Sequence, residues 1–80
     1  MSRIAPIHWK ILECIFQQDG FSLYRQESSH RVYVKKEFSR PIVIPTHKSV
    51  GLDVINSNRR SAKMSREKYL RLLEICKNKT

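Results

Sequence analysis

The chain has 80 residues, of which 16 are Lys or Arg and seven are Asp or Glu, for a net charge of +9. A chain of this length buries about 60% of its unfolded surface in one core, so we expect residues 1–80 to form a single domain, and the charge indicates a polyanionic partner such as nucleic acid. Apolar runs are too short to span a membrane and no signal-peptide pattern is present, so we expect a cytoplasmic protein without membrane contact.

The first predicted element is a helix from Pro6 to Asp19. Its apolar residues recur at the spacing of one helix face, and they are Ile7, Ile11, Leu12, Ile15 and Phe16. Pro6 suits the first helical position, and Gly20 suits the position just past the end. His8 falls between the apolar side and the solvent side, so we expect it to be structural or exposed.

Three strands follow, because the apolar pattern changes to a period of two residues. The predicted ranges are 21–26, 30–35 and 41–45. A short polar turn joins the first two strands, which indicates an antiparallel hairpin. The prolines that bound the third strand suit a strand at the edge of a sheet.

The alternation also predicts which face each side chain occupies. His30, Val32 and Val34 share one side of the second strand, and we expect that side to face the helices. Tyr24 and Tyr33 lie on the outward side, where they could stack on RNA bases or pair across strands.

The pattern weakens after the third strand. We expect a long loop at about residues 48–64, with at most one helical turn near residues 52–55. Ser65 is the predicted N-cap of a closing helix, with Glu67 in its first turn. The apolar positions of this helix are Tyr69, Leu70, Leu72, Leu73, Ile75 and Cys76.

The element order α-β-β-β-α predicts an α+β fold. A three-stranded antiparallel sheet with two helices packed on one face buries both helical stripes. This is the layout of double-stranded RNA-binding domains.

The two cysteines, Cys14 and Cys76, have neither CxxC nor Cys/His spacing. That spacing indicates neither a zinc site nor a disulfide framework. Each cysteine lies in an apolar helical stripe, where a thiol packs as a small hydrophobe. We therefore expect two separate structural thiols.

Three stretches, in this order, resemble the HicA toxins of bacterial toxin-antitoxin pairs, which are small ribonucleases acting on messenger RNA. "WKILECIFQQDGFSLYRQ" is similar to the family's first helix, its G-[FW] and a strand ending in R-Q. "SHRVYV" resembles G-S-H with an aromatic residue three positions later, and "IVIPTH" resembles V-P-x-H. The likeness covers about residues 7–47, with a looser match in "YLRLLEIC". It implies a metal-independent mRNA interferase, silenced by an acidic antitoxin of the HicB type.

The chain departs from the family pattern in three places. Ser28 stands where glycine is usual, and Arg31 stands where a second histidine is common. Residues 48–64 are longer than the family's link to its last helix. Glycine at the first position indicates a backbone that needs conformational freedom.

By resemblance, His30 corresponds to the catalytic histidine. Cleavage of RNA without a metal requires proton transfer at a ribose 2′-hydroxyl and at the leaving oxygen, and histidine titrates near neutrality. From spacing alone, His30 could equally be an edge residue without chemistry, which leaves a non-catalytic RNA-binding module as the alternative function. His47 could be a second acid or base, a phosphate ligand or a solvated loop residue.

Two basic sets could hold the RNA phosphates. The set around the hairpin is Arg25, Arg31, Lys35 and Lys36. The set that runs into the last helix is Arg59, Arg60, Lys63, Arg66, Lys68 and Arg71. We expect RNA affinity to fall steeply with salt, and no motif indicates a metal or a cofactor. A third possibility is a domain whose basic face docks an acidic protein without binding RNA.

Overall fold

The computed structural model describes residues 4–36 and 40–79, which form three helices and one three-stranded sheet. In chain order the elements are α1 (Trp9–Gln18), β1 (Phe21–Glu27), β2 (His30–Lys35), β3 (Ile42–Pro45), α2 (Leu52–Ser61) and α3 (Arg66–Lys79). The predicted α+β fold with an antiparallel three-stranded sheet is confirmed. One further helix, α2, precedes the closing helix.

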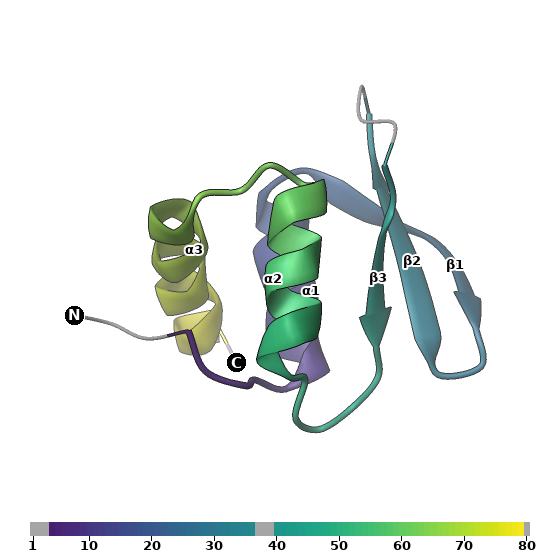
Figure 1. The fold of residues 1–80 in the computed structure, drawn as a ribbon, viewed down its shortest axis with the longest axis horizontal. Coiled ribbons are helices and arrows are strands. Elements are labelled where there is room, and N and C mark those ends of the chain that lie inside the picture. The colour runs from purple at the N-terminus through teal and green to yellow at the C-terminus, as the bar shows by residue number, and fades with distance from the viewer. Residues whose placement is uncertain (1–3, 37–39, 80) are drawn as a thin grey trace.

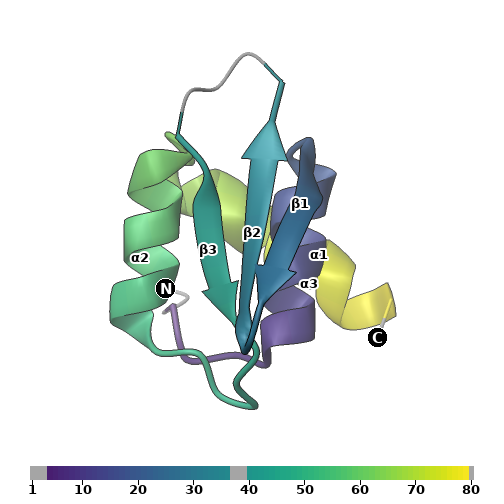
Figure 2. The same ribbon diagram turned by 90° about the vertical axis from the view of Figure 1, so that its right-hand side faces the viewer.

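The elements form layers, with the sheet on one side of the molecule and α3 on the other (Figure 1). Helices α1 and α2 lie between them, and α2 runs beside β3 (Figure 2). The strand order is β1-β2-β3, and both strand pairs are antiparallel. The sheet therefore has an inner face toward α1 and an outer face that points away from the helices.

Helix α1 begins at Trp9 and not at the predicted Pro6. His8 is its N-cap, because its Nδ1 accepts a hydrogen bond from the backbone N–H two residues later at 3.1 Å. Ile7 instead forms an antiparallel bridge with Val50, with N···O distances of 3.3 and 2.7 Å. The segment just before α1 is thus tied to the segment after β3, and His8 has the structural role that was predicted as one of two possibilities.

The predicted orientation of β2 is wrong. Tyr33 is fully buried, and its hydroxyl donates a short hydrogen bond to Glu13 on α1. His30, Val32 and Val34 therefore lie on the outer face, and His30 is exposed. Burying a tyrosine removes more apolar area from water than burying a valine, and here the phenol also finds a partner.

The core lies between the inner face of the sheet and the helices. Its buried apolar members are Leu12, Ile15, Phe16, Phe21, Tyr33, Ile42, Ile44, Val50, Ile55, Ala62, Met64, Tyr69, Leu72, Leu73 and Cys76. Every helix and every strand contributes at least one of them. The core therefore includes α2, so this helix is an integral part of the domain.

The predicted long loop at residues 48–64 is wrong, because this stretch contains α2. The helix buries Ile55 and Asn58, and Ala62 is buried just past its end. The Asn58 amide donates a hydrogen bond from Nδ2 to the backbone oxygen of Val43 at 3.1 Å, which attaches α2 to β3. A buried asparagine breaks the apolar spacing of a helix, so the sequence pattern looked weak.

The prediction of two separate thiols is also wrong. Cys14 on α1 and Cys76 on α3 form a disulfide, with 5.8 Å between their Cα atoms. The two helices pack against each other, so apolar stripes from opposite ends of the chain meet. A sequence separation of 62 residues gave no local signal of this contact.

Helix α3 begins as predicted. The hydroxyl of Ser65 accepts a hydrogen bond from the backbone N–H of Lys68 at 3.1 Å, and Glu67 lies in the first turn. Both features satisfy or complement the unpaired N–H groups of a helix start.

Within residues 4–36 and 40–79, no helix is both long and apolar enough to cross a membrane.

Candidate functional site

A two-residue turn between β1 and β2 places His30 at the first position of the central strand, at the end of the sheet nearest the start of α1. Glu27 and His30 are paired across the turn, and Ser28 has a φ of 56°, which is left-handed. A glycine adopts this conformation without steric cost, whereas a serine meets a steric cost there. The oxygen of Ser29 accepts from the backbone N–H and the hydroxyl of Thr46, at 2.8 and 3.1 Å, so the turn is fixed to the segment after β3.

His30 lies at one end of a groove between β3 and α2. The groove has a volume of about 360 Å³, near the lower end of the range of roughly 300–1,000 Å³ for small-molecule sites. It is lined by His30, Pro41, Val43, Pro45, Val54, Ser57, Asn58 and Ser61. Because His30 pairs with Pro45 across the strands, the imidazole lies where β3 ends.

The groove lining combines apolar surface with hydroxyl groups. Val43 and Val54 face it from β3 and α2, and Ser57 and Ser61 add hydroxyls along α2. No Asp, Glu, Lys or Arg is among the described residues that line it. A neutral planar group can thus enter, with hydrogen-bonding groups at its edge.

The structure brings His47 to the same end of the sheet as His30. Thr46 is bonded to the turn before β2, and the next residue, His47, accepts a backbone hydrogen bond from Trp9 at 3.2 Å. The His47 side chain is exposed. The two predicted histidines therefore lie at one end of the domain.

Arg31 points to the inner face and forms a polar cluster there. Its Nε donates to the Tyr33 hydroxyl at 2.9 Å, and its Nη atoms donate to Gln26 at 2.7 Å and Glu13 at 2.9 Å. The guanidinium carbon lies 5.1 Å from the centroid of the Trp9 ring. These contacts join β2 to α1. They turn Arg31 away from the outer face. Tyr33 is buried, so it cannot stack on a base, which was one of its two predicted roles.

Two buried tyrosines resist ionisation. Burial raises the pKa of Tyr33 to about 12, and its hydrogen bond to Glu13 adds to the rise. Burial also raises the pKa of Tyr69 to about 12. The Tyr69 hydroxyl is the one buried side-chain polar atom among residues 4–36 and 40–79 that has no hydrogen-bond partner. Neither phenol can supply charge to a site near neutral pH.

The hairpin set of cations divides into anchored and exposed members. Lys35 lies 3.6 Å from the buried carboxylate of Asp19, and Lys68 forms a short ion pair with the same carboxylate. Arg25 has 57% of its side chain exposed, and Lys36 is exposed at the end of β2. Arg25 and Lys36 therefore remain accessible to phosphate, whereas Lys35 and Lys68 help to hold β2 and α3 to the end of α1.

Arg59 stabilises the end of α2. Its guanidinium donates to Asn56 Oδ1 at 3.1 and 3.2 Å and to the backbone oxygen of Met64 at 3.2 Å. Arg59 and Arg66 also line a second cavity, of about 420 Å³, with Ile4 as an apolar wall. The predicted arginines thus come together here, but away from the groove that ends at His30.

Three exposed cations lie near the groove lining in the sequence, although none of them lines the groove itself. Arg40 precedes Pro41, and Arg60 precedes Ser61, and both of these neighbours line the groove. Lys63 follows at the end of α2, and all three cations are exposed. The groove thus has an imidazole at one end, and two lining residues at the other end have an exposed arginine as their chain neighbour.

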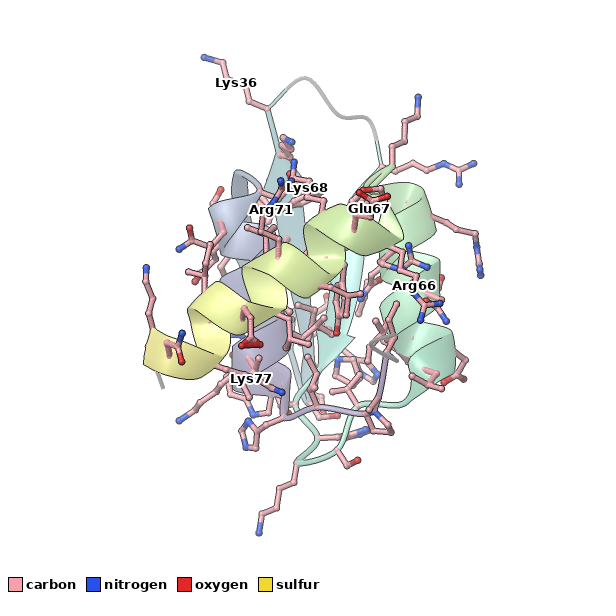
Figure 3. The ribbon with its side chains drawn as sticks, turned by 90° about the vertical axis from the view of Figure 1, so that its left-hand side faces the viewer. Lys36, Arg66, Glu67, Lys68, Arg71 and Lys77 are labelled. Atoms are coloured by element: carbon pink, nitrogen blue, oxygen red, sulfur yellow. A yellow bond between two sulfur atoms is a disulfide. The ribbon has the colours of Figure 1, made fainter. Side chains whose placement is uncertain are left out.

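The cations of α3 face the other side of the molecule. Figure 3 shows Arg71 and Lys77 on α3, on the side of the molecule away from the sheet, and Arg66 at the start of α3 beside α2. The sheet with His30 lies beyond α1 and α2 (Figure 1). The structure therefore does not unite Arg66 and Arg71 with His30, although all three were predicted site residues.

The sequence reasoning missed one wall of the groove. Val54, Ser57 and Ser61 lie on one side of α2 at helical spacing, but this segment was predicted as a loop. Arg40 was missed as well, because it stands between a turn and a proline. The one sequence signal of this helix is the three-residue spacing of Ile55 and Asn58, which are its buried positions.

No group of three His, Cys, Asp or Glu side chains in the described part of the chain could hold a metal ion. No protein-family model matches this chain, and no curated protein matches it.

Proposed function

We propose that the protein is a metal-independent endoribonuclease, acting as the mRNA interferase toxin of a bacterial toxin-antitoxin pair. His30 is its general acid or base. The observation that carries this proposal is the exposed imidazole at the end of the groove between β3 and α2. The resemblance of the hairpin and of β3 to HicA toxins supports the same assignment.

The reaction needs a base, an acid and a positive environment. The ribose 2′-oxygen gives up its proton and forms a bond to phosphorus, while the bond from phosphorus to the 5′-oxygen breaks and that oxygen takes up a proton. His30 can accept the first proton or donate the second, and His47 is the candidate for the other transfer. Arg40, Arg60 and Lys63 can offset the negative charge of the phosphates at the far end of the groove.

The partners follow from charge. A net charge of +9 on 80 residues favours association with RNA and with an acidic protein. We assign the second role to an antitoxin of the HicB type that covers the groove and His30. Action on messenger RNA places the protein in the cytoplasm.

The test is cleavage of single-stranded RNA in EDTA. An all-ribose oligonucleotide should be cut, and the same oligonucleotide with one 2′-deoxy residue at the cut position should resist. The fragments should end in a 2′,3′-cyclic phosphate. Equal cleavage of the deoxy-substituted strand would rule out attack by the 2′-oxygen.

A non-catalytic RNA-binding module is the second candidate. It is favoured by one observation: within residues 4–36 and 40–79 no hydrogen bond orients the imidazole of His30. This candidate predicts that RNA stays intact after long incubation, and that His30→Ala binds RNA as tightly as the wild type does.

A further inference from the structure

We infer that the groove between β3 and α2 binds a segment of single-stranded RNA, with one nucleobase on the surface formed by Val43 and Val54. This inference rests on the proposed function, because it assigns the substrate position of the same site. It commits to an unpaired strand, since a base in a duplex is stacked and cannot enter a groove of this size.

The lining favours a base over a phosphate inside the groove. Val43 is 40% exposed, so apolar surface is available to the flat face of a base. The hydroxyls of Ser57 and Ser61 can bond to base edges, which present both donors and acceptors. A phosphate would meet no Lys or Arg among the lining residues that the structure describes.

The two ends of the groove favour the RNA backbone. β3 and the proline before it span five residues, so the groove follows roughly 13 Å of strand from Pro41 to Pro45. His30 stands at one end, and at the other end the lining residues Pro41 and Ser61 are each preceded in the chain by an exposed arginine, Arg40 and Arg60. A strand that enters past these arginines has its phosphates neutralised there, and a later linkage of the same strand reaches the imidazole.

The hydrogen bond from Asn58 to Val43 makes the groove a preformed feature. It joins α2 to the backbone of β3, so the distance between the two walls is set before RNA arrives. A preformed groove loses little conformational entropy on binding.

The experiment measures binding separately from cleavage. A short 2′-O-methyl RNA strand lacks the nucleophile, so its dissociation constant reports binding alone. The variant Ser57→Phe fills the groove from an exposed position on α2. Asn78→Phe is the matched control, because it adds the same ring to an exposed polar position on α3.

Ser57→Phe should raise the dissociation constant about tenfold, the scale of one lost base contact, while Asn78→Phe should leave it unchanged. A strand with abasic sites should bind the wild type as weakly as the intact strand binds Ser57→Phe. Equal binding of the intact strand by wild type and Ser57→Phe would overturn the inference.

Amide shifts of the wild-type protein decide the question if Ser57→Phe does not fold. Shifts on adding the strand should gather on β3 and on the facing side of α2; shifts confined to α3 would overturn the inference. The two proposals fail differently. If His30→Ala abolishes cleavage but Ser57→Phe binds normally, the groove assignment alone is wrong, whereas wild-type protein that binds in the groove without cutting refutes the catalytic proposal alone.

Discussion

Ser28 holds the hairpin in a conformation that costs free energy. A non-glycine residue in the left-handed region costs roughly 1–2 kcal/mol, and Ser28 has a φ of 56°. Ser28→Gly should therefore raise the free energy of unfolding, by about 0.5–1 kcal/mol after the extra entropy of glycine in the unfolded chain. Urea denaturation followed by circular dichroism measures the change.

Ser29→Gly is the control for this prediction. Ser29 is not among the described residues with positive φ, so glycine there should lower stability. If Ser28→Gly were as destabilising as Ser29→Gly, the assigned turn conformation would be wrong.

Replacing a buried tyrosine with phenylalanine should have opposite effects on the free energy of unfolding at the two positions. Tyr69→Phe removes a buried hydroxyl that has no partner within the described residues, and should stabilise the protein by about 1 kcal/mol. Tyr33→Phe leaves Glu13 and Arg31 without the phenol they contact, and should destabilise it by roughly 1–3 kcal/mol. Denaturant midpoints of the two variants give the comparison, and a loss of stability in Tyr69→Phe would contradict the account.

The sequence predicted that His30 begins the second strand, but it did not predict which face of the sheet the imidazole occupies. Both sides of β2 carry apolar groups, so alternation alone did not decide which side is buried. Tyr33 decides it, because Glu13 on α1 satisfies its hydroxyl. That contact spans 20 residues and has no local signature.

At the scale of elements, the disulfide is the strongest single constraint on α3. It closes a loop of 62 residues, and the chain-entropy relation gives roughly 4 kcal/mol of stabilisation for such a loop. Replacing both Cys14 and Cys76 with alanine should lower the free energy of unfolding by a comparable amount. Denaturation of the oxidised wild type and the double variant measures it.

Reduction of the wild type provides the control for the cysteine pair. Disulfides are rare in the cytoplasm, so the proposed action there requires the protein to keep its fold as a dithiol. The reduced protein should therefore remain folded and cleave RNA at the same rate as the oxidised protein, because His30 and the groove lie on elements other than α3. Loss of cleavage on reduction, with the fold intact, would contradict this separation.

The strands and the first and last helices were predictable because their apolar spacing is regular. Helix α2 was not, since its buried side includes Asn58 and its exposed side is rich in serine, asparagine and arginine. The asparagine serves β3 rather than the apolar core. A polar contact to another element thus stands where an apolar residue would have marked the helix. Without that apolar spacing, neither α2 nor its wall of the groove could be predicted.

Across the whole molecule, the exposed cations are spread over several faces. Arg40 and Arg60 precede groove-lining residues in the chain, whereas Arg71 and Lys77 project from α3 on the far side (Figure 3). Each phosphate contact on a single strand adds about 0.7 to the slope of log affinity against log salt. Arg40→Gln with Arg60→Gln should therefore reduce that slope by about 1.4, as measured by fluorescence anisotropy.

Arg71→Gln with Lys77→Gln removes the same charge from the opposite face. This matched pair should leave the slope unchanged, because α3 does not border the groove. If both pairs reduced the slope equally, RNA would be held by the overall charge and not by the groove.

The central claim is that the imidazole of His30 transfers a proton during RNA cleavage. The most direct measurement is the single-turnover rate constant for cutting a single-stranded RNA in EDTA by wild type and by His30→Ala, with RNA binding and folding of both proteins verified. The account predicts a loss of about 10²–10⁴-fold in the variant, with RNA affinity retained. Equal rate constants for the two proteins would contradict it.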